Sequence, residues 1–204
     1  MNKPDFNLNP DGHRRYLVNA PLTFQRAEGD KKAARISGIA SRVDVSYDMY
    51  WWKEVIQKGA FDDCLNDDVR CLFNHDPSLL LARKGPNSST LNYYLDAQGN
   101  LAYDYETPDR SFAWDLQDMV ERGDVDKSSF QFSISDYRWE MQDGEDLLVI
   151  TKMKRLYDVS PVTFPASDAT TTELSERSKG NGLVLPTKRS FNTELAQRKF
   201  QLLR

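Results

Sequence analysis

The sequence predicts an α+β domain made mostly of antiparallel strands, in which about six to eight strands and one or two helices suggest an antiparallel barrel. Three observations predict this fold. Apolar and polar residues alternate in many short segments, two polar turns each join a pair of such segments, and one long stretch in the body has clear helical spacing. A chain of 204 residues is long enough for one such domain plus terminal tails.

The first part of the chain contains short strands and one segment that we expect to be helical. Residues 15–18 together with 22–24 are predicted to form a first strand, and residues 34–41 a second. The segment 54–65 is expected to be helical, with an interruption at Gly59, because its apolar residues can share one helical face.

Two pairs of strands are predicted next. Residues 69–73 and 79–83 are expected to be strands joined by a turn that contains His75. Residues 91–95 and 101–105 flank the polar sequence Asp-Ala-Gln-Gly-Asn and carry aromatic residues in alternation, which predicts a β-hairpin.

One long helix is predicted in the body, where four apolar residues recur at helical spacing: Phe112, Leu116, Met119 and Val120. Asp109 is a suitable N-terminal cap for this helix, and Gly123 is a suitable stop. Alternation returns at Ser129, reverses at the turn 143–146 and continues over residues 147–160, so a second hairpin is predicted here.

We expect four parts along the chain: an N-terminal segment with the first strand at 1–33, the barrel domain at 34–168, a flexible linker at 169–187 and a basic amphipathic helix at 188–204. The linker is rich in small and polar residues and has few apolar anchors. The terminal helix is marginal alone but long enough to dock on a partner.

Composition indicates an ordinary water-soluble globular protein, with 39% hydrophobic and 28% charged residues and a mean hydropathy of −0.66. No apolar run approaches the ~20 residues of a membrane span, and the first residues lead into no signal-peptide core. We therefore expect the protein to stay in the cytoplasm of the cell that makes it.

Charge is unevenly distributed along the chain. The net charge is −4, but the segment from Ser175 to the end has seven basic and two acidic residues, net +5, which leaves −9 for the body. An acidic body argues against broad nucleic-acid binding. The basic tail either contacts an acidic partner surface or is simply solvated.

The chain has two cysteines, Cys64 and Cys71, and two histidines. This set is too small and too dispersed for a disulfide framework or a zinc site, so both thiols are expected to be reduced core residues. We predict no metal and no cofactor.

His75 is the first candidate for a chemical role, because it follows an apolar run and precedes Asp-Pro, where a strand delivers a side chain to the rim of a sheet. An imidazole titrates near pH ~6.5 and can act as a general base at neutral pH. On its own, a histidine at such a position is more often an ordinary surface residue of a turn.

A nucleophile for this base is expected in the pair Ser128 and Ser129, which opens a strand at the sheet rim. Asp158, late in the last long strand, is a candidate to orient the imidazole. The alternatives are a turn-capping serine pair and a solvent-facing aspartate. Cys64 and Cys71 are weaker nucleophile candidates because each lies within an apolar pattern, and no Gly-x-Ser-x-Gly motif is present.

Five short motifs in this order carry a resemblance to a known family: residues 36–40, 54–61, 72–76, 128–132 and 158–166. From about Arg35 to Ala166, the chain resembles the prohead (capsid maturation) proteases of tailed bacteriophages. The resemblance implies a fold similar to that of the herpesvirus assemblins, so we expect a mostly antiparallel β-barrel of about six to eight strands wrapped by a few helices.

The resemblance also implies roles for three residues. It places the family's histidine, the general base, at His75 and the serine nucleophile at Ser129. The third member falls at Asp158, where assemblins carry a second histidine. Gln131 stands two residues after the serine, where members of the family often have glycine.

The activity implied by the resemblance is that of a serine endopeptidase. Inside the assembling capsid, or prohead, in the host cytoplasm, it would cut scaffold segments or the N-terminal part of the major capsid protein, and then itself. The expected partners are those proteins and further copies of the chain, as a homodimer or higher assembly, with no nucleic acid and no membrane.

Two other functions remain open at this point. The first is a non-catalytic capsid or scaffold-binding module with the same fold, which the glutamine at position 131 favours. The second is a single-strand binding barrel that would stack bases on four aromatic residues: Trp51, Trp52, Tyr93 and Tyr103. The negative body argues against the second.

Overall fold

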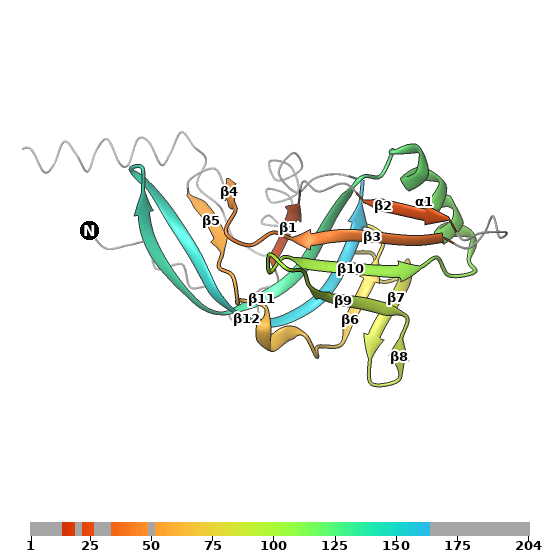
Figure 1. Ribbon diagram of the computed structural model, residues 1–204, viewed down its shortest axis with the longest axis horizontal. Helices are drawn as coiled ribbons and strands as arrows, with labels where there is room; N and C mark the ends of the chain where they lie inside the picture. Colours follow the sequence, from red (N-terminus) through yellow and green to blue (C-terminus); the bar gives the residue numbers. More distant parts are fainter. Residues whose placement is uncertain (1–13, 19–21, 27–33, 49–51, 164–204) are drawn as a thin grey trace, which may run out of the picture. The chain divides into compact units, whose positions relative to one another are not determined.

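The computed structural model describes residues 14–18, 22–26, 34–48 and 52–163, which form two β-sheets and one α-helix (Figure 1). All of them belong to one compact unit, Met1–Ser167. The predicted linker and the predicted basic terminal helix lie outside the described residues. The domain boundaries given above therefore stay predictions.

The first sheet has eight strands and is centred on a long antiparallel hairpin. Its strand order is β1 (Arg14–Val18), β11 (Lys127–Gln142), β12 (Glu145–Val162), β6 (Val69–Leu72), β7 (Leu80–Gly85), β8 (Ser88–Ser89), with β5 (Lys53–Ile56) beside β12 and β4 (Ser46–Asp48) beside β5. Strands β5 and β6 run parallel to β12, and the other pairs in this sheet are antiparallel.

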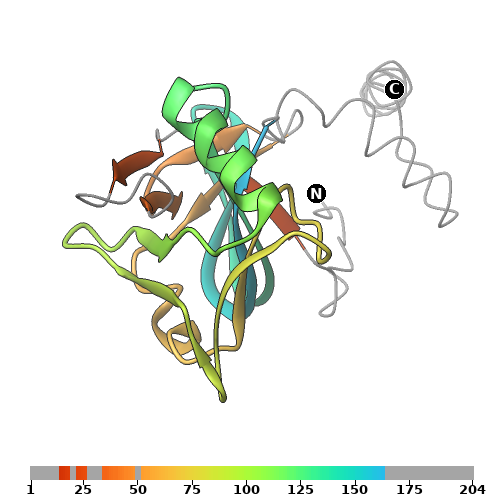
Figure 2. The same cartoon turned by 90° about the vertical axis from the view of Figure 1, so that its right-hand side faces the viewer.

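The second sheet has four antiparallel strands in the order β2 (Thr23–Arg26), β3 (Ala34–Ser41), β10 (Leu101–Glu106), β9 (Leu91–Leu95). The predicted β9–β10 hairpin is confirmed. Helix α1 (Ser111–Arg122) faces the viewer in Figure 2 and is joined to β2 by an ion pair between Glu121 and Arg26.

The core lies between the two sheets and is rich in aromatic side chains. Phe130 and Phe132 project from β11, are fully buried and stack with ring centroids 4.8 Å apart. Phe61 packs edge-on against Phe130 at 5.8 Å. Tyr103 and Ile36 of the second sheet are fully buried in the same cluster. Aromatic rings bury large areas, so this cluster is a main source of stability.

The predicted mostly β fold is confirmed but the predicted barrel is not, because the described strands form two sheets that are not closed into a barrel. A few helices were predicted to wrap the barrel. The described residues contain one α-helix, α1. The predicted first strand is in fact two strands, β1 and β2, which belong to different sheets. An apolar pattern shows that a segment is a strand but does not show which sheet it joins.

The predicted helix at 54–65 is also wrong. Residues 53–56 pair in parallel with β12 as strand β5, and only Asp62–Cys64 forms a single 3₁₀ turn. Two consecutive β-branched residues favour the strand, and Gly59, with φ of 92°, turns the chain after it.

Helix α1 was predicted correctly, but its start differs. The residue at the N-cap position is Arg110, which has an extended backbone and makes no capping hydrogen bond with its side chain. The predicted cap by Asp109 is therefore wrong. Gly123 ends the helix as predicted, with φ of 80° and its N–H bonded to the carbonyl of Val120.

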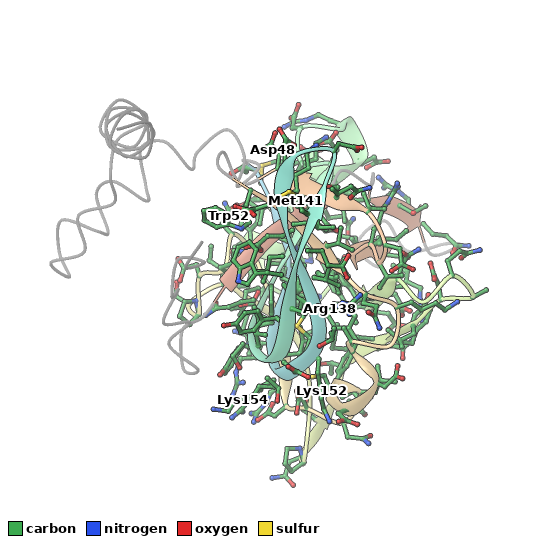
Figure 3. All side chains as sticks on the ribbon, turned by 90° about the vertical axis from the view of Figure 1, so that its left-hand side faces the viewer. Asp48, Trp52, Arg138, Met141, Lys152 and Lys154 are labelled. Atoms are coloured by element: carbon green, nitrogen blue, oxygen red, sulfur yellow. The ribbon has the colours of Figure 1, made fainter. Side chains whose placement is uncertain are left out.

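The two halves of the β11–β12 hairpin have different neighbouring strands. Figure 3 views it from the side of the turn and labels Arg138 and Met141 on β11 and Trp52, which directly precedes β5. Near the turn, Trp52 packs edge-on against Trp139 with centroids 6.4 Å apart, and β5 pairs with β12. The other half of the hairpin pairs with β1 and β6, and carries Ser129 and Asp158.

Gly38 of β3 allows the second sheet to approach the start of β11. A methyl group at this position would lie 2.6 Å from Ser128 Oγ, 2.8 Å from Leu22 Cδ2 and 2.9 Å from Tyr103 Cε1. We expect Gly38→Ala to lower the free energy of unfolding in urea by about 1–3 kcal/mol, because these neighbours must move apart. Ser37→Ala on the opposite face is the control and should change it by less than about 0.5 kcal/mol. Equal effects of the two substitutions would contradict this packing.

Candidate active site

Three polar side chains from distant parts of the sequence meet on the outer face of the first sheet, away from the core. His75 Nε2 lies 2.7 Å from Ser129 Oγ, and His75 Nδ1 lies 2.6 Å from Asp158 Oδ1. The side chains of His75 and Asp158 are only 7% and 4% exposed, and Ser129 is 3% exposed. With so little water around them, electrostatic interactions between these groups are strong.

Ser129 reaches this face by strand alternation. Ser128, Phe130 and Phe132 point to the core, and Ser128 Oγ hydrogen-bonds to the hydroxyl of Tyr103 at 2.9 Å. Successive residues of a strand point to opposite faces, so Ser129 between them points outward. The two serines of the pair therefore have different environments.

Asp158 reaches the same face because of a β-bulge. Phe132 pairs with Leu156, but Gln131 pairs with Asp158, so Tyr157 is one extra residue in β12. In a regular strand, residues two apart share a face, so Asp158 would point into the core on the same side as buried Leu156. The bulge shifts the alternation by one and turns the carboxylate outward.

A side chain stabilises the backbone at this bulge. The N–H of Leu156 donates to Asp67 Oδ2 at 2.8 Å. This hydrogen bond satisfies a backbone donor directly before the extra residue.

His75 lies in the loop between β6 and β7, and its neighbour ties this loop to the end of β12. Asn74 donates its backbone N–H to the carbonyl of Pro161 at 3.0 Å. Asn74 Oδ1 accepts from the N–H and the hydroxyl of Thr163, at 2.9 and 3.2 Å. The loop that carries His75 is thus fastened to the strand that carries Asp158.

The backbone of this loop is unusual. Asn74 and His75 have φ of 54° and 58°, in the left-handed region that few residues other than glycine adopt. The following turn is closed by Asp76, whose Oδ1 accepts from the N–H and hydroxyl of Ser78. These hydrogen bonds lower the pKa of Asp76. Several independent contacts hold the loop in a conformation that it would not adopt alone.

The hydrogen bonds fix the tautomer of His75. An ionised carboxylate can only accept, so the Nδ1 atom that faces Asp158 carries the proton. In the neutral imidazole, Nε2 is then an acceptor and takes the hydroxyl proton of Ser129 in a hydrogen bond. This arrangement can remove a proton from the serine when the hydroxyl attacks an electrophile.

Ser160 is a further member of this cluster that sequence reasoning missed. Its hydroxyl donates to Asp158 Oδ1 at 2.7 Å, and the residue is fully buried. It pairs in register with Ser129 on the neighbouring strand. The available signal was its position two residues after Asp158, which places both side chains on one face of a strand.

The two cysteines are poor alternatives to the serine. Both are free and buried, and burial raises the pKa of Cys64 to about 12 and that of Cys71 well above its ordinary value. A raised pKa leaves less of the reactive thiolate at a given pH.

We therefore expect the native protein to resist iodoacetamide at pH 8. Mass spectrometry should find neither cysteine modified before unfolding and both modified in urea, because the reactive thiolate forms only when the thiols are exposed. Rapid modification of Cys64 or Cys71 in the folded protein would contradict their assignment as inert core residues.

Other site types find little support in the described residues. No group of histidine, cysteine, aspartate or glutamate residues there is arranged to hold a metal ion. No described helix combines the length and the apolar character needed to cross a membrane. Tyr93 and Tyr103 are buried and Trp52 packs on Trp139, so these three do not form a base-stacking platform. Trp51 lies outside the described residues.

A chain of serine, histidine and aspartate joined by two short hydrogen bonds is typical of hydrolytic enzymes that activate a hydroxyl group. The protein belongs to the Caudovirus prohead serine protease family, because the model of that family matches residues 21–183 of its sequence. The membership confirms the prediction of a bacteriophage protease of capsid maturation. The predicted similarity to the assemblins stays a prediction.

Among solved structures, the chain is similar to the capsid assembly protease gp21 of bacteriophage T4. The two share 15% sequence identity with a TM-score of 0.40, over 74% of this chain and 99% of that one. No curated protein matches the sequence.

Proposed function

We propose that this protein is a serine endopeptidase of the prohead, with Ser129 as nucleophile, His75 as general base and Asp158 as the residue that orients the histidine. The observation that carries the proposal is the continuous hydrogen-bonded chain from Ser129 through His75 to Asp158, with distances of 2.7 and 2.6 Å. The three residues come from different elements and meet in a nearly dry site, as an activated serine requires.

In the acylation step, Ser129 Oγ attacks the carbonyl carbon of the substrate peptide bond while its proton passes to His75 Nε2. The imidazolium that forms is stabilised by the carboxylate of Asp158 at Nδ1. The imidazolium then gives its proton to the leaving nitrogen, so the peptide bond breaks and an ester remains on Ser129.

The ester is hydrolysed by the same groups in reverse roles. Water loses a proton to His75 Nε2 and attacks the ester carbonyl, and the proton then returns to Ser129 Oγ as the product acid leaves. Throughout the cycle, Asp158 keeps the Nδ1 proton in place. The histidine can therefore exchange protons only on the side of the serine.

The proposed substrates are the scaffold or the N-terminal part of the major capsid protein, and then the protease itself, inside the assembling capsid in the host cytoplasm. The segment 169–187 is the proposed self-cleavage region, because its composition is that of an accessible linker. The basic segment 188–204 is proposed to tether the enzyme to the shell. Further copies of the chain, as a dimer or higher assembly, are proposed partners.

The test follows the intact mass of the purified full chain over time, alone and with its phage's major capsid protein. A fluorophosphonate reagent added in parallel reports the activated serine directly, since Ser129 Oγ bonds to phosphorus, fluoride leaves and the proton goes to His75. We expect cleavage products, and a single reagent adduct at Ser129 that blocks their formation.

Other outcomes would replace the proposal. A folded protein that neither cleaves the capsid protein nor reacts with the reagent would favour the non-catalytic binding module. An adduct on a different residue, with cleavage blocked, would keep the protease but refute Ser129 as its nucleophile.

A further inference from the structure

We propose that Ser160 is a positioning residue, which holds the carboxylate of Asp158 in the orientation that His75 needs. The proposal rests on the proposed function and extends the site by one member. It predicts that the Ser160 hydroxyl affects the rate of the chemical step without contacting the substrate.

The first argument is the shared acceptor. Asp158 Oδ1 lies 2.7 Å from Ser160 Oγ and 2.6 Å from His75 Nδ1. The carboxylate can only accept, so the hydroxyl of Ser160 donates to it. One oxygen atom thus receives both hydrogen bonds, and its position is fixed from two directions.

The second argument is burial. Ser160 is fully buried and Asp158 is 3% exposed, so water has little access to replace a missing donor at this carboxylate. A hydrogen bond to a charged acceptor in such surroundings is stronger than one between neutral groups in water. Ser160→Ala removes the hydroxyl, which leaves Oδ1 with one donor fewer and lets the carboxylate rotate about its bond to Cβ.

The third argument is the place of Ser160 in the sheet. It pairs in register with Ser129, and it follows Asp158 by two residues on the same strand. Backbone hydrogen bonds between β11 and β12 therefore set the position of the nucleophile, the carboxylate and the Ser160 hydroxyl together. A donor built into the same strand as its acceptor loses little entropy when it forms the bond.

The kinetic test measures how fast Ser129 reacts with a fluorophosphonate, in the full chain. Ser160→Ala is expected to lower the maximal inactivation rate by roughly 10- to 100-fold, with the half-saturating reagent concentration changed less than about twofold, because orientation and not binding is lost. Ser160→Thr keeps a hydroxyl and should regain most of the rate.

Ser133→Ala is the matched control, since Ser133 is equally buried on β11 but lies near the hydroxyl of Tyr157, 3.4 Å away. It removes the same oxygen atom and should leave the inactivation rate within about twofold of the original. Equal losses in the Ser133 and Ser160 variants, or an unchanged rate in Ser160→Ala, would overturn the proposal.

A spectroscopic measurement reads the same effect without any reaction. The chain has only two histidines, His13 and His75, so ¹⁵N-histidine labelling gives two imidazoles that a His13→Gln variant separates. The Nδ1 proton of His75 is expected downfield, and Ser160→Ala should shift it as the bond to Asp158 changes. An unmoved resonance would refute the positioning role. Because this measurement needs no cleavage, failure of the proposed function and failure of the Ser160 role can be told apart.

Discussion

Ser129→Ala should lower the rate of capsid-protein cleavage by about 10⁴- to 10⁶-fold and leave the fold intact. The substitution removes the one hydroxyl that lies 2.7 Å from His75 Nε2, so no acyl-enzyme can form. The removed oxygen belongs to a side chain on the outer face of the sheet, and the aromatic core on the inner face is not changed. Processing is followed by intact-mass analysis of the full chain with the capsid protein, and folding by circular dichroism.

Ser128→Ala is the control for this prediction, because the two serines are neighbours with different environments. Ser128 Oγ bonds to the buried hydroxyl of Tyr103 at 2.9 Å on the core side. We expect its loss to reduce the free energy of unfolding by about 1–3 kcal/mol but to preserve cleavage. Cleavage that survives in Ser129→Ala and disappears in Ser128→Ala would reverse the assignment of the nucleophile.

The features that depend on local pattern could be predicted from the sequence. The alternation around Phe130 and Phe132 predicted the strand that carries Ser129, and the break after an apolar run predicted the loop that carries His75. Both predictions need only the period of a strand and the chemistry of turns. The pairing of His75 with Ser129 could not be predicted from local pattern alone, because 54 residues separate them and only the tertiary fold brings them together.

The features that depend on strand pairing could not be predicted in the same way. The orientation of Asp158 depends on the extra residue Tyr157, and nothing in the residue types of β12 marks that position as a bulge. Strand β5 was mistaken for a helix for a related reason. Its four residues are too few to define a period, and the parallel pairing with β12 that stabilises them is a contact between distant parts of the chain.

Asp158→Asn is the second substitution with a large expected effect. We expect cleavage to fall by about 10⁴-fold, the order seen when the aspartate of a serine–histidine–aspartate triad is replaced by asparagine. An amide of the same shape can turn its NH₂ group toward His75 Nδ1, which then accepts a hydrogen bond where it formerly donated one. The imidazole proton moves to Nε2, and this atom can no longer accept the proton of Ser129. Rates with the capsid protein and with the fluorophosphonate should fall together, because both need the same proton transfer.

Asp104→Asn is the matched control, since Asp104 is also a buried aspartate but lies in the second sheet, where it pairs with Arg35 and accepts from Asn92 at 2.9 Å. The same change of carboxylate to amide there should lower stability and leave cleavage unchanged. If both substitutions reduce cleavage only in proportion to lost stability, Asp158 is a structural partner of His75 and not its orienting residue. If Asp158→Asn alone abolishes cleavage in a folded protein, Asp158 is the orienting residue, and the bulge at Tyr157 matters for catalysis because it turns this carboxylate from the core toward the histidine.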